Sequence, residues 1–172
     1  MIAHDPVFGS PNPNAPAELT RFAFLIGKWR CIADILLEDG SRQTFPAIWT
    51  GRYILDGFVI ADDYCMNNLE GDPIVLGLNL RSYDAAQQRW NMRWLNALSG
   101  SWTDLCSDEL GGAHFGENTV SYVFREPVAG HAFTRATYTA LEPDHFTWLG
   151  EKSSDLVSWT EFMLVDCYRV EL

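Results

Sequence analysis

Three titratable side chains in strand-like segments could support acid–base chemistry: Asp104, His131 and Glu161. Alternation along its segment puts Asp104 on the same face as Trp102 and Cys106. A carboxyl group among large apolar side chains resists ionisation, which suits a general acid or base in an isomerase, cyclase or hydratase. Alternation does not establish which face of a strand points inward. We therefore keep an enzyme acting on an apolar substrate as an alternative, assign no catalytic residue, and expect a binding protein.

Arg135 and Glu161 suggest a different use of strand charges, which is to anchor a ligand. Arg135 shares a face with Phe133, and Glu161 shares one with Trp159 and Met163. If both charges point inward, they must pair or hold a polar group of a ligand, because an isolated buried charge is costly. Both are candidate ligand-binding residues, and simple exposure to solvent is the competing interpretation.

Aromatic residues are frequent: the chain has seven Trp, ten Phe and six Tyr. Large rings line ligand cavities, but they also fill cores. The mixture of residue sizes on the inferred inward faces predicts a modest cavity that binds a small, mostly apolar molecule. A barrel filled by its own rings is the alternative. Besides Arg135 and Glu161, the candidate ligand-binding residues are Trp49, Tyr53, Trp90, Met92, Trp94, Trp102, Trp148 and Trp159.

The sequence contains no recognisable metal or cofactor motif. Its histidines form neither HxH nor HExxH; they are His4, His114, His131 and His145. The chain also lacks a Gly-x-Ser-x-Gly elbow, a phosphate-binding loop and a dinucleotide fingerprint. We therefore expect no metal and no cofactor.

Composition argues against several classes of partner. A formal net charge of -11 opposes binding to nucleic acids and to anionic membrane surfaces. The four cysteines are widely spaced without a CxxC pair, which favours reduced, buried thiols. The first residues lack the basic and apolar regions of a signal peptide, and no stretch approaches the roughly 18 apolar residues of a membrane helix. These features predict a cytoplasmic protein that binds neither nucleic acid nor membranes.

The elements that must position the candidate residues are almost all strands. Residues 1–15 are rich in Pro, Asn and Ala and predict a flexible arm, whereas 16–172 predict a single domain. That domain begins with the short helix "PAELTRFAFL", in which Leu19, Phe22 and Ala23 share a face. The following segments alternate in polarity and are separated by turn residues. The predicted strands are 28–37, 43–55, 57–66, 73–83, 88–97, 101–108, 118–126, 131–141, 144–152 and 157–169.

About ten sequential strands joined by short turns predict an antiparallel up-and-down meander. The pair Asp56-Gly57 is typical of a two-residue hairpin turn. A sheet of this length must curl or split, and closure into a barrel removes its exposed edges. We therefore predict an all-β fold, a closed antiparallel barrel of about ten strands with a short N-terminal helix.

The order of four short motifs resembles the calycin group, which includes lipocalins and fatty-acid-binding proteins. The motifs are "LIGKW", "LDGFVI", "LRSYDAAQQRW" and the terminal "CYRVEL", and together they are similar to a bacterial family of lipocalin-like domains of unknown function. The resemblance implies that Trp29 packs at the closed end of the barrel with Arg169 across its indole, and that Gly27 permits the tight corner before the first strand. The turn motif "TDY" of secreted lipocalins is missing.

Two further alternatives follow from this resemblance and from the strand pattern. Haem-binding barrels related to this group need an inward histidine on a late strand, which makes His131 and His145 the candidates, although alternation places His145 outward. A structural role is the other alternative, as a homodimer formed through the barrel wall. The apolar side chains predicted to face outward there are Ile32, Leu36, Phe162 and Leu164.

Overall fold

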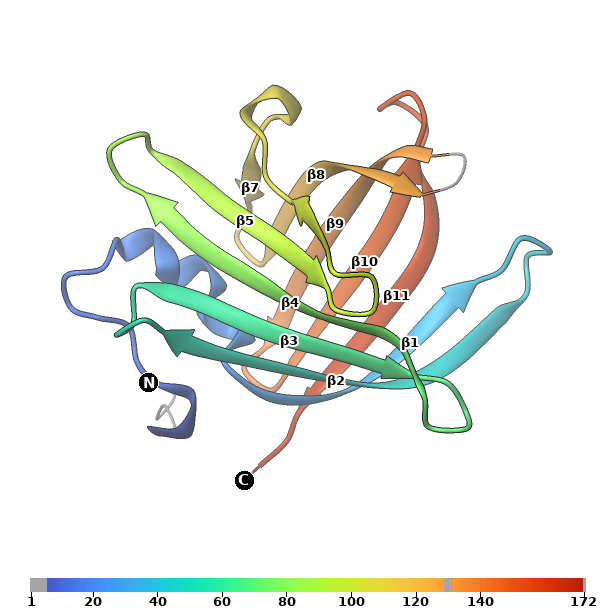
Figure 1. The fold of residues 1–172 in the computed structure, drawn as a ribbon, viewed down its shortest axis with the longest axis horizontal. Helices are drawn as coiled ribbons and strands as arrows, with labels where there is room; N and C mark the ends of the chain where they lie inside the picture. Colours follow the sequence, from blue (N-terminus) through green and yellow to red (C-terminus); the bar gives the residue numbers. More distant parts are fainter. Residues whose placement is uncertain (1–5, 129–130, 172) are drawn as a thin grey trace.

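The computed structural model describes residues 6–128 and 131–171, and its strands form one antiparallel sheet (Figure 1). The sheet has eleven strands in the order β6-β5-β4-β3-β2-β1-β11-β10-β9-β8-β7. Apart from β6 and β7, consecutive strands pair as a meander, and β1 joins the two halves by pairing with β11. The strands are β1 (Gly27–Leu36), β2 (Arg42–Ile54), β3 (Val59–Asn67), β4 (Pro73–Asp84), β5 (Arg89–Asn96), β6 (Ser101–Asp104), β7 (Ala113–Phe115), β8 (Thr119–Val128), β9 (His131–Glu142), β10 (His145–Ser153) and β11 (Thr160–Arg169).

The sheet curls so that β2–β5 form one wall and β8–β11 form the facing wall (Figure 1). The prediction of a fully closed barrel is not met, because no ladder joins β6 to β7 among the described residues. Both edge strands are short, and the predicted strand 101–108 ends at Asp104. The chain then makes a 3-10 turn, η3 (Asp108–Leu110), and β7 follows in a segment where the sequence predicted no strand.

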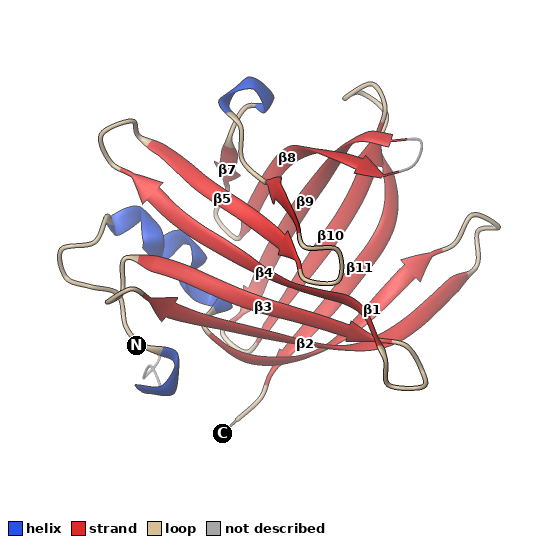
Figure 2. Ribbon diagram, in the orientation of Figure 1, coloured by secondary structure: helices blue, strands red, loops and turns tan. Residues whose placement is uncertain are grey.

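A 3-10 helix, η2 (Ala17–Leu25), fills one end of the curled sheet (Figure 2). The sequence predicted a short helix here, and its buried residues recur every three positions, at Leu19, Phe22 and Leu25, as expected for 3-10 geometry. The ring of Phe22 makes an edge contact with Trp90 at 4.9 Å between centroids, which ties the helix to β5. No helix within the described residues has the length and apolar character that a membrane span requires.

The corner between η2 and β1 contains the contact that the resemblance implies. The guanidinium carbon of Arg169 lies 4.0 Å from the centroid of the Trp29 ring, and Arg169 donates hydrogen bonds to the carbonyl oxygens of Ile26 (2.8 Å) and Pro143 (2.9 Å). Gly27 has a φ of 130°, and a side chain there would collide with the Arg169 guanidinium. A cation over an indole contributes roughly 0.5–2 kcal/mol, so this cluster stabilises the end of the sheet.

The segment before η2 packs against the sheet. Its first turn is η1 (Pro6–Phe8), and the side chain of Phe8 is buried. The amide of Asn12 donates to the carbonyl oxygen of Gly57 at 3.2 Å. The expectation of a free arm is therefore corrected from Pro6 onward, because Phe8 joins the core; residues 1–5 lie outside the described part.

Candidate functional site

A cavity of about 180 Å³ lies between the two walls of the sheet. For comparison, an engineered cavity of about 150 Å³ accepts benzene, so this volume suits one ring with a short substituent. Aromatic and aliphatic side chains dominate its lining, as in most small-molecule sites. The lining residues are Trp49, Tyr64, Val75, Asn79, Trp94, Leu105, Tyr122, Phe124, Thr134, Ala136, Tyr138, Trp148, Phe162, Met163 and Val165.

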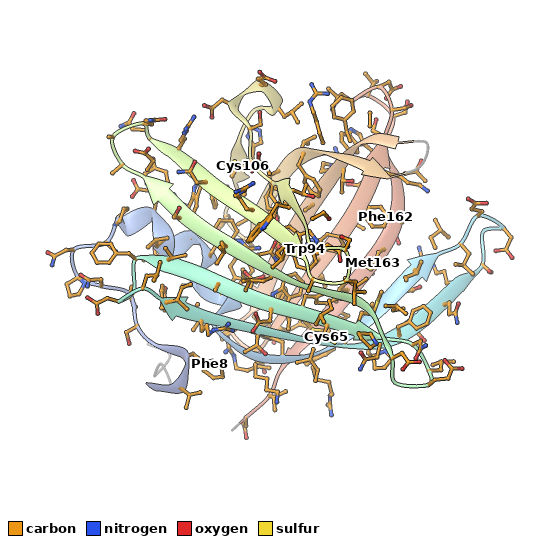
Figure 3. The ribbon with its side chains drawn as sticks, viewed as in Figure 1. Phe8, Cys65, Trp94, Cys106, Phe162 and Met163 are labelled. Atoms are coloured by element: carbon orange, nitrogen blue, oxygen red, sulfur yellow. The ribbon has the colours of Figure 1, made fainter. Side chains whose placement is uncertain are left out.

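The cavity has a mouth and a floor that differ in character. The partly exposed lining residues form the mouth, and the remaining lining residues are buried and form the floor. Figure 3 labels three mouth side chains, Trp94 from β5 and Phe162 and Met163 from β11, which belong to facing walls. A ligand entering from solvent would pass between apolar side chains. The mouth residues are Val75, Trp94, Trp148, Phe162 and Met163.

Two glycines allow the mouth rings to lie close to the sheet. A Cβ atom on Gly150 would lie 2.5 Å from the ring of Trp148 and 2.6 Å from the ring of Phe162. A Cβ atom on Gly77 would collide with the indole of Trp94. Since real Cβ atoms do not approach other atoms this closely, the missing side chains are a steric requirement for the ring positions.

A β-bulge in β11 determines which of its side chains reach the cavity. Gly150 of β10 pairs with Met163, but the next residue, Glu151, pairs with Glu161, so Phe162 is an extra residue. Both Phe162 and Met163 line the cavity as a result. Glu161 is displaced to the outer face, where it accepts a hydrogen bond from Arg42 at 2.8 Å.

The bulge corrects two predictions. Glu161 is not an inward ligand-binding residue, because its carboxylate pairs with Arg42 outside the cavity. Phe162 does not contribute to an outer apolar patch with Ile32, because its ring lines the cavity. The predicted dimer surface of Ile32, Leu36, Phe162 and Leu164 is therefore not assembled as expected, and a homodimer has no support.

A buried ion pair lies beneath the floor of the cavity. The side chains of Asp62 on β3 and Arg81 on β4 are in contact, and both are 0% exposed. Asp62 Oδ1 also accepts hydrogen bonds from Trp49 Nε1 and Asn79 Nδ2, each at 2.8 Å. The carboxylate is thus held by one cation and two neutral donors, which offset the cost of burying its charge. Trp49 and Asn79 also line the cavity, so the pair fixes part of its floor.

Arg81 connects this pair to the opposite wall. Its Nη2 atom donates to the hydroxyl of Tyr138 on β9 at 2.9 Å, and its guanidinium lies 4.9 Å from the ring centroid of Phe22. The hydroxyls of Tyr138 and Tyr122 are 3.2 Å apart. Burial raises the pKa of Tyr138 well above its ordinary value, so its hydroxyl remains protonated at physiological pH. Both tyrosines line the cavity.

Tyr64 supplies a hydroxyl that has no partner. Its side chain is only 5% exposed and lines the cavity, and its Oη atom makes no hydrogen bond within the described residues. Burial raises the pKa of Tyr64 above its ordinary value, so this group is a hydrogen-bond donor. The ring packs at 5.0 Å from Trp49, which holds the hydroxyl in place.

The tryptophans predicted to bind ligand divide into three groups. Trp49, Trp94 and Trp148 line the cavity. Trp90 is buried but packs against Phe22 of η2, outside the lining. The predicted residues Met92 and Tyr53 are likewise buried without belonging to the cavity lining.

Trp102 and Trp159, the other two, lie outside the cavity. The side chain of Trp102 is 45% exposed, and Arg93 lies over its ring at 5.2 Å. The inward orientation predicted for Trp102 is corrected, because the register pairs Thr103 with the cavity residue Trp94 and so places Trp102 on the opposite face.

Arg135 is also placed away from the cavity. Its guanidinium forms two hydrogen bonds with Glu151, at 2.7 and 2.8 Å, and lies 4.4 Å from the ring centroid of Trp159. The alternating residues Thr134 and Ala136 line the cavity instead. Arg135 and Trp159 are therefore outer-face neighbours, and the predicted inward anchor is corrected.

The described side chains considered for acid–base or haem chemistry do not meet in the cavity. Asp104 has a 74% exposed side chain and pairs with Arg93, and His145 lies 2.5 Å from Asp166 on the outer face. The side chain of His131 lies outside the described part. Among the described residues, no histidine lines the cavity.

Sequence reasoning missed the polar residues around the floor. Asp62 shares a strand face with Ile60, Tyr64 and Met66. It therefore has large apolar neighbours, as do the candidates Asp104 and Glu161. Arg81 shares a face with Gly77 and Asn79, whereas the leucines of this strand lie on the other face. The sequence therefore suggests that the face with Arg81 is polar and exposed to solvent. Both were overlooked because charged residues are seldom buried.

Comparisons with known proteins support the type of fold. No family model and no curated protein matches the chain. The chain is similar to the crystal structure of Rv2717c from M. tuberculosis, with a TM-score of 0.63 at 6% identity, covering 92% of this chain and 100% of that chain. It is also similar to a redesigned β-barrel, mFAP1, bound to DFHBI, with a TM-score of 0.43 at 15% identity, covering 86% and 96% respectively. The similarity to Rv2717c establishes a barrel-type fold alone.

Proposed function

We propose that this protein is a lipocalin-like barrel that binds one small, mostly apolar molecule in its cavity. The observation that supports the proposal is a space of about 180 Å³ with a partly exposed apolar mouth and an aromatic floor. A barrel filled by its own rings would not leave such a space, because protein interiors pack as densely as organic crystals. The four unpaired cysteines fit the reducing cytoplasm that we expect for it.

A cavity-filling variant tests this proposal. Ala136 is 1% exposed and lines the cavity, so Ala136→Leu places extra atoms inside it. The neighbouring residue Thr137 does not line the cavity, and alternation puts it on the outer face, so Thr137→Leu is a matched control.

The probe is α-methylstyrene, an apolar single ring with a short substituent, and its binding is measured by calorimetric titration. We expect binding to the wild type and to Thr137→Leu, and an affinity at least about tenfold lower for Ala136→Leu, a difference of about 1.4 kcal/mol. Absence of binding to the wild type, or equal binding to all three proteins, would contradict the proposal.

A further inference from the structure

Within the described residues, the hydroxyls of Tyr122 and Tyr138 on the cavity floor have more protons than acceptors. Tyr138 accepts a hydrogen bond from Arg81, which can only donate. The single contact between the hydroxyls of Tyr138 and Tyr122 uses one of their two protons. Whichever tyrosine donates in that contact, the proton of the other has no acceptor in it. Both side chains line the cavity, so the spare proton belongs to its floor.

Tyr64 adds a second spare donor. Its side chain lines the cavity, and its buried hydroxyl has no hydrogen-bond partner within the described residues. Leaving a buried hydroxyl unpaired is unfavourable, and native proteins rarely retain such a group without a function or a bound molecule. An acceptor atom on a ligand would satisfy it.

The charges around the floor favour a neutral ligand over an anion. Arg81 is the buried cation nearest to these hydroxyls, and it is in contact with the carboxylate of Asp62. Its charge is therefore compensated, and the chain as a whole has a formal net charge of -11. The ring of Trp49 lies 5.0 Å from Tyr64 and 5.8 Å from Tyr138, so the donors flank an aromatic surface.

We propose that the cavity binds a neutral single-ring aromatic compound with a hydrogen-bond acceptor, such as an aryl ketone or aldehyde. The ring lies between the mouth tryptophans and the floor, and the acceptor oxygen takes the protons of Tyr64 and of the Tyr122–Tyr138 pair. This inference rests on the proposed function, since it names the class of ligand for the same cavity.

The test compares two probes of nearly the same shape, acetophenone and α-methylstyrene, which differ by a carbonyl oxygen in place of a methylene group. Each is titrated into the wild type, Tyr64→Phe, Tyr122→Phe and Tyr168→Phe. Tyr168 lies on the outer face, where its hydroxyl donates to Asp166, and serves as the control. The ratio of the two affinities within each protein cancels differences in ring packing.

We expect the ratio of acetophenone to α-methylstyrene affinity to fall about five- to tenfold in Tyr64→Phe, which removes one spare donor. In Tyr122→Phe the ratio should fall less, because the proton of Tyr138 is then spare and the pair still offers one donor. The ratio should be unchanged in Tyr168→Phe, and α-methylstyrene should still bind Tyr64→Phe, which shows that the variant is folded. An equal ratio in all four proteins, with both probes bound, overturns the inference and leaves the proposed function standing. Failure of both probes to bind the wild type overturns both.

Discussion

Replacing Arg81 by methionine should strongly destabilise the protein. The substitution keeps a side chain of similar length but removes the only cation that contacts Asp62 among the described residues, and the side chain of Asp62 is 0% exposed. Removing one member of a buried ion pair typically costs 3–5 kcal/mol, because the other charge is left uncompensated. Trp49 and Asn79 still donate to the carboxylate, so we expect a loss near the lower limit, about 3 kcal/mol.

The assay is urea denaturation followed by tryptophan fluorescence, with the free energy of unfolding extrapolated to zero urea. The double variant Asp62→Asn with Arg81→Met removes both charges, and most of the lost stability should return.

Two results would refute this reasoning. The first is a loss below about 1 kcal/mol in Arg81→Met at neutral pH, which would mean that the pair is accessible to water. The second is a double variant no more stable than the single variant.

Three further perturbations test other parts of the structure. Gly150→Ala should cost about 1–3 kcal/mol in urea denaturation, since its Cβ would meet the rings of Trp148 and Phe162; an unchanged midpoint would contradict the steric requirement. Arg169→Met should lower the free energy of unfolding by about 2 kcal/mol, because the contacts with Trp29 and the Ile26 carbonyl are lost, while the affinity for α-methylstyrene stays unchanged. A parallel loss of affinity would contradict this, because it would show that this end of the sheet is part of the site. Burial raises the pKa of Cys106 from its ordinary value of 9.0 to about 11. Its alkylation at pH 8 should therefore be about 100-fold slower than that of a free cysteine and should still rise with pH above 10, as measured by mass spectrometry of the labelled peptide. A rate that levels off below pH 9 would contradict this.

The sequence was sufficient to predict the meander but not its edges. Alternating polarity and turn residues such as Asp56-Gly57 are local features, and they predicted strands close to the observed β1 to β5 and β8 to β11. The failure to close reflects the lack of a ladder between two very short strands, β6 and β7, in the described chain, and alternating polarity does not predict which edge strands pair. A segment of three residues, Ala113–Phe115, is also too short for alternation to be recognised.

The cavity could be predicted only in part, for two physical reasons. The bulge at Phe162 reverses the phase of alternation within β11, so residues before it point to the opposite face from the one expected. The buried pair Asp62 and Arg81 is stabilised by contacts between strands, which the sequence of either strand alone does not show. The sequence correctly predicted three tryptophans of the cavity lining, because their strands alternate regularly up to the cavity. These are Trp49, Trp94 and Trp148.

The most direct test of the central claim is to titrate acetophenone into nitrogen-15-labelled protein and follow the indole N–H resonances of its seven tryptophans. The cavity is lined by Trp49, Trp94 and Trp148, whereas Trp102 and Trp159 lie outside it. We predict saturable shifts of the three cavity indoles and unchanged positions for the two outer ones. Saturable shifts confined to Trp102 or Trp159, or no saturable shift at all, would contradict a ligand site between the two walls.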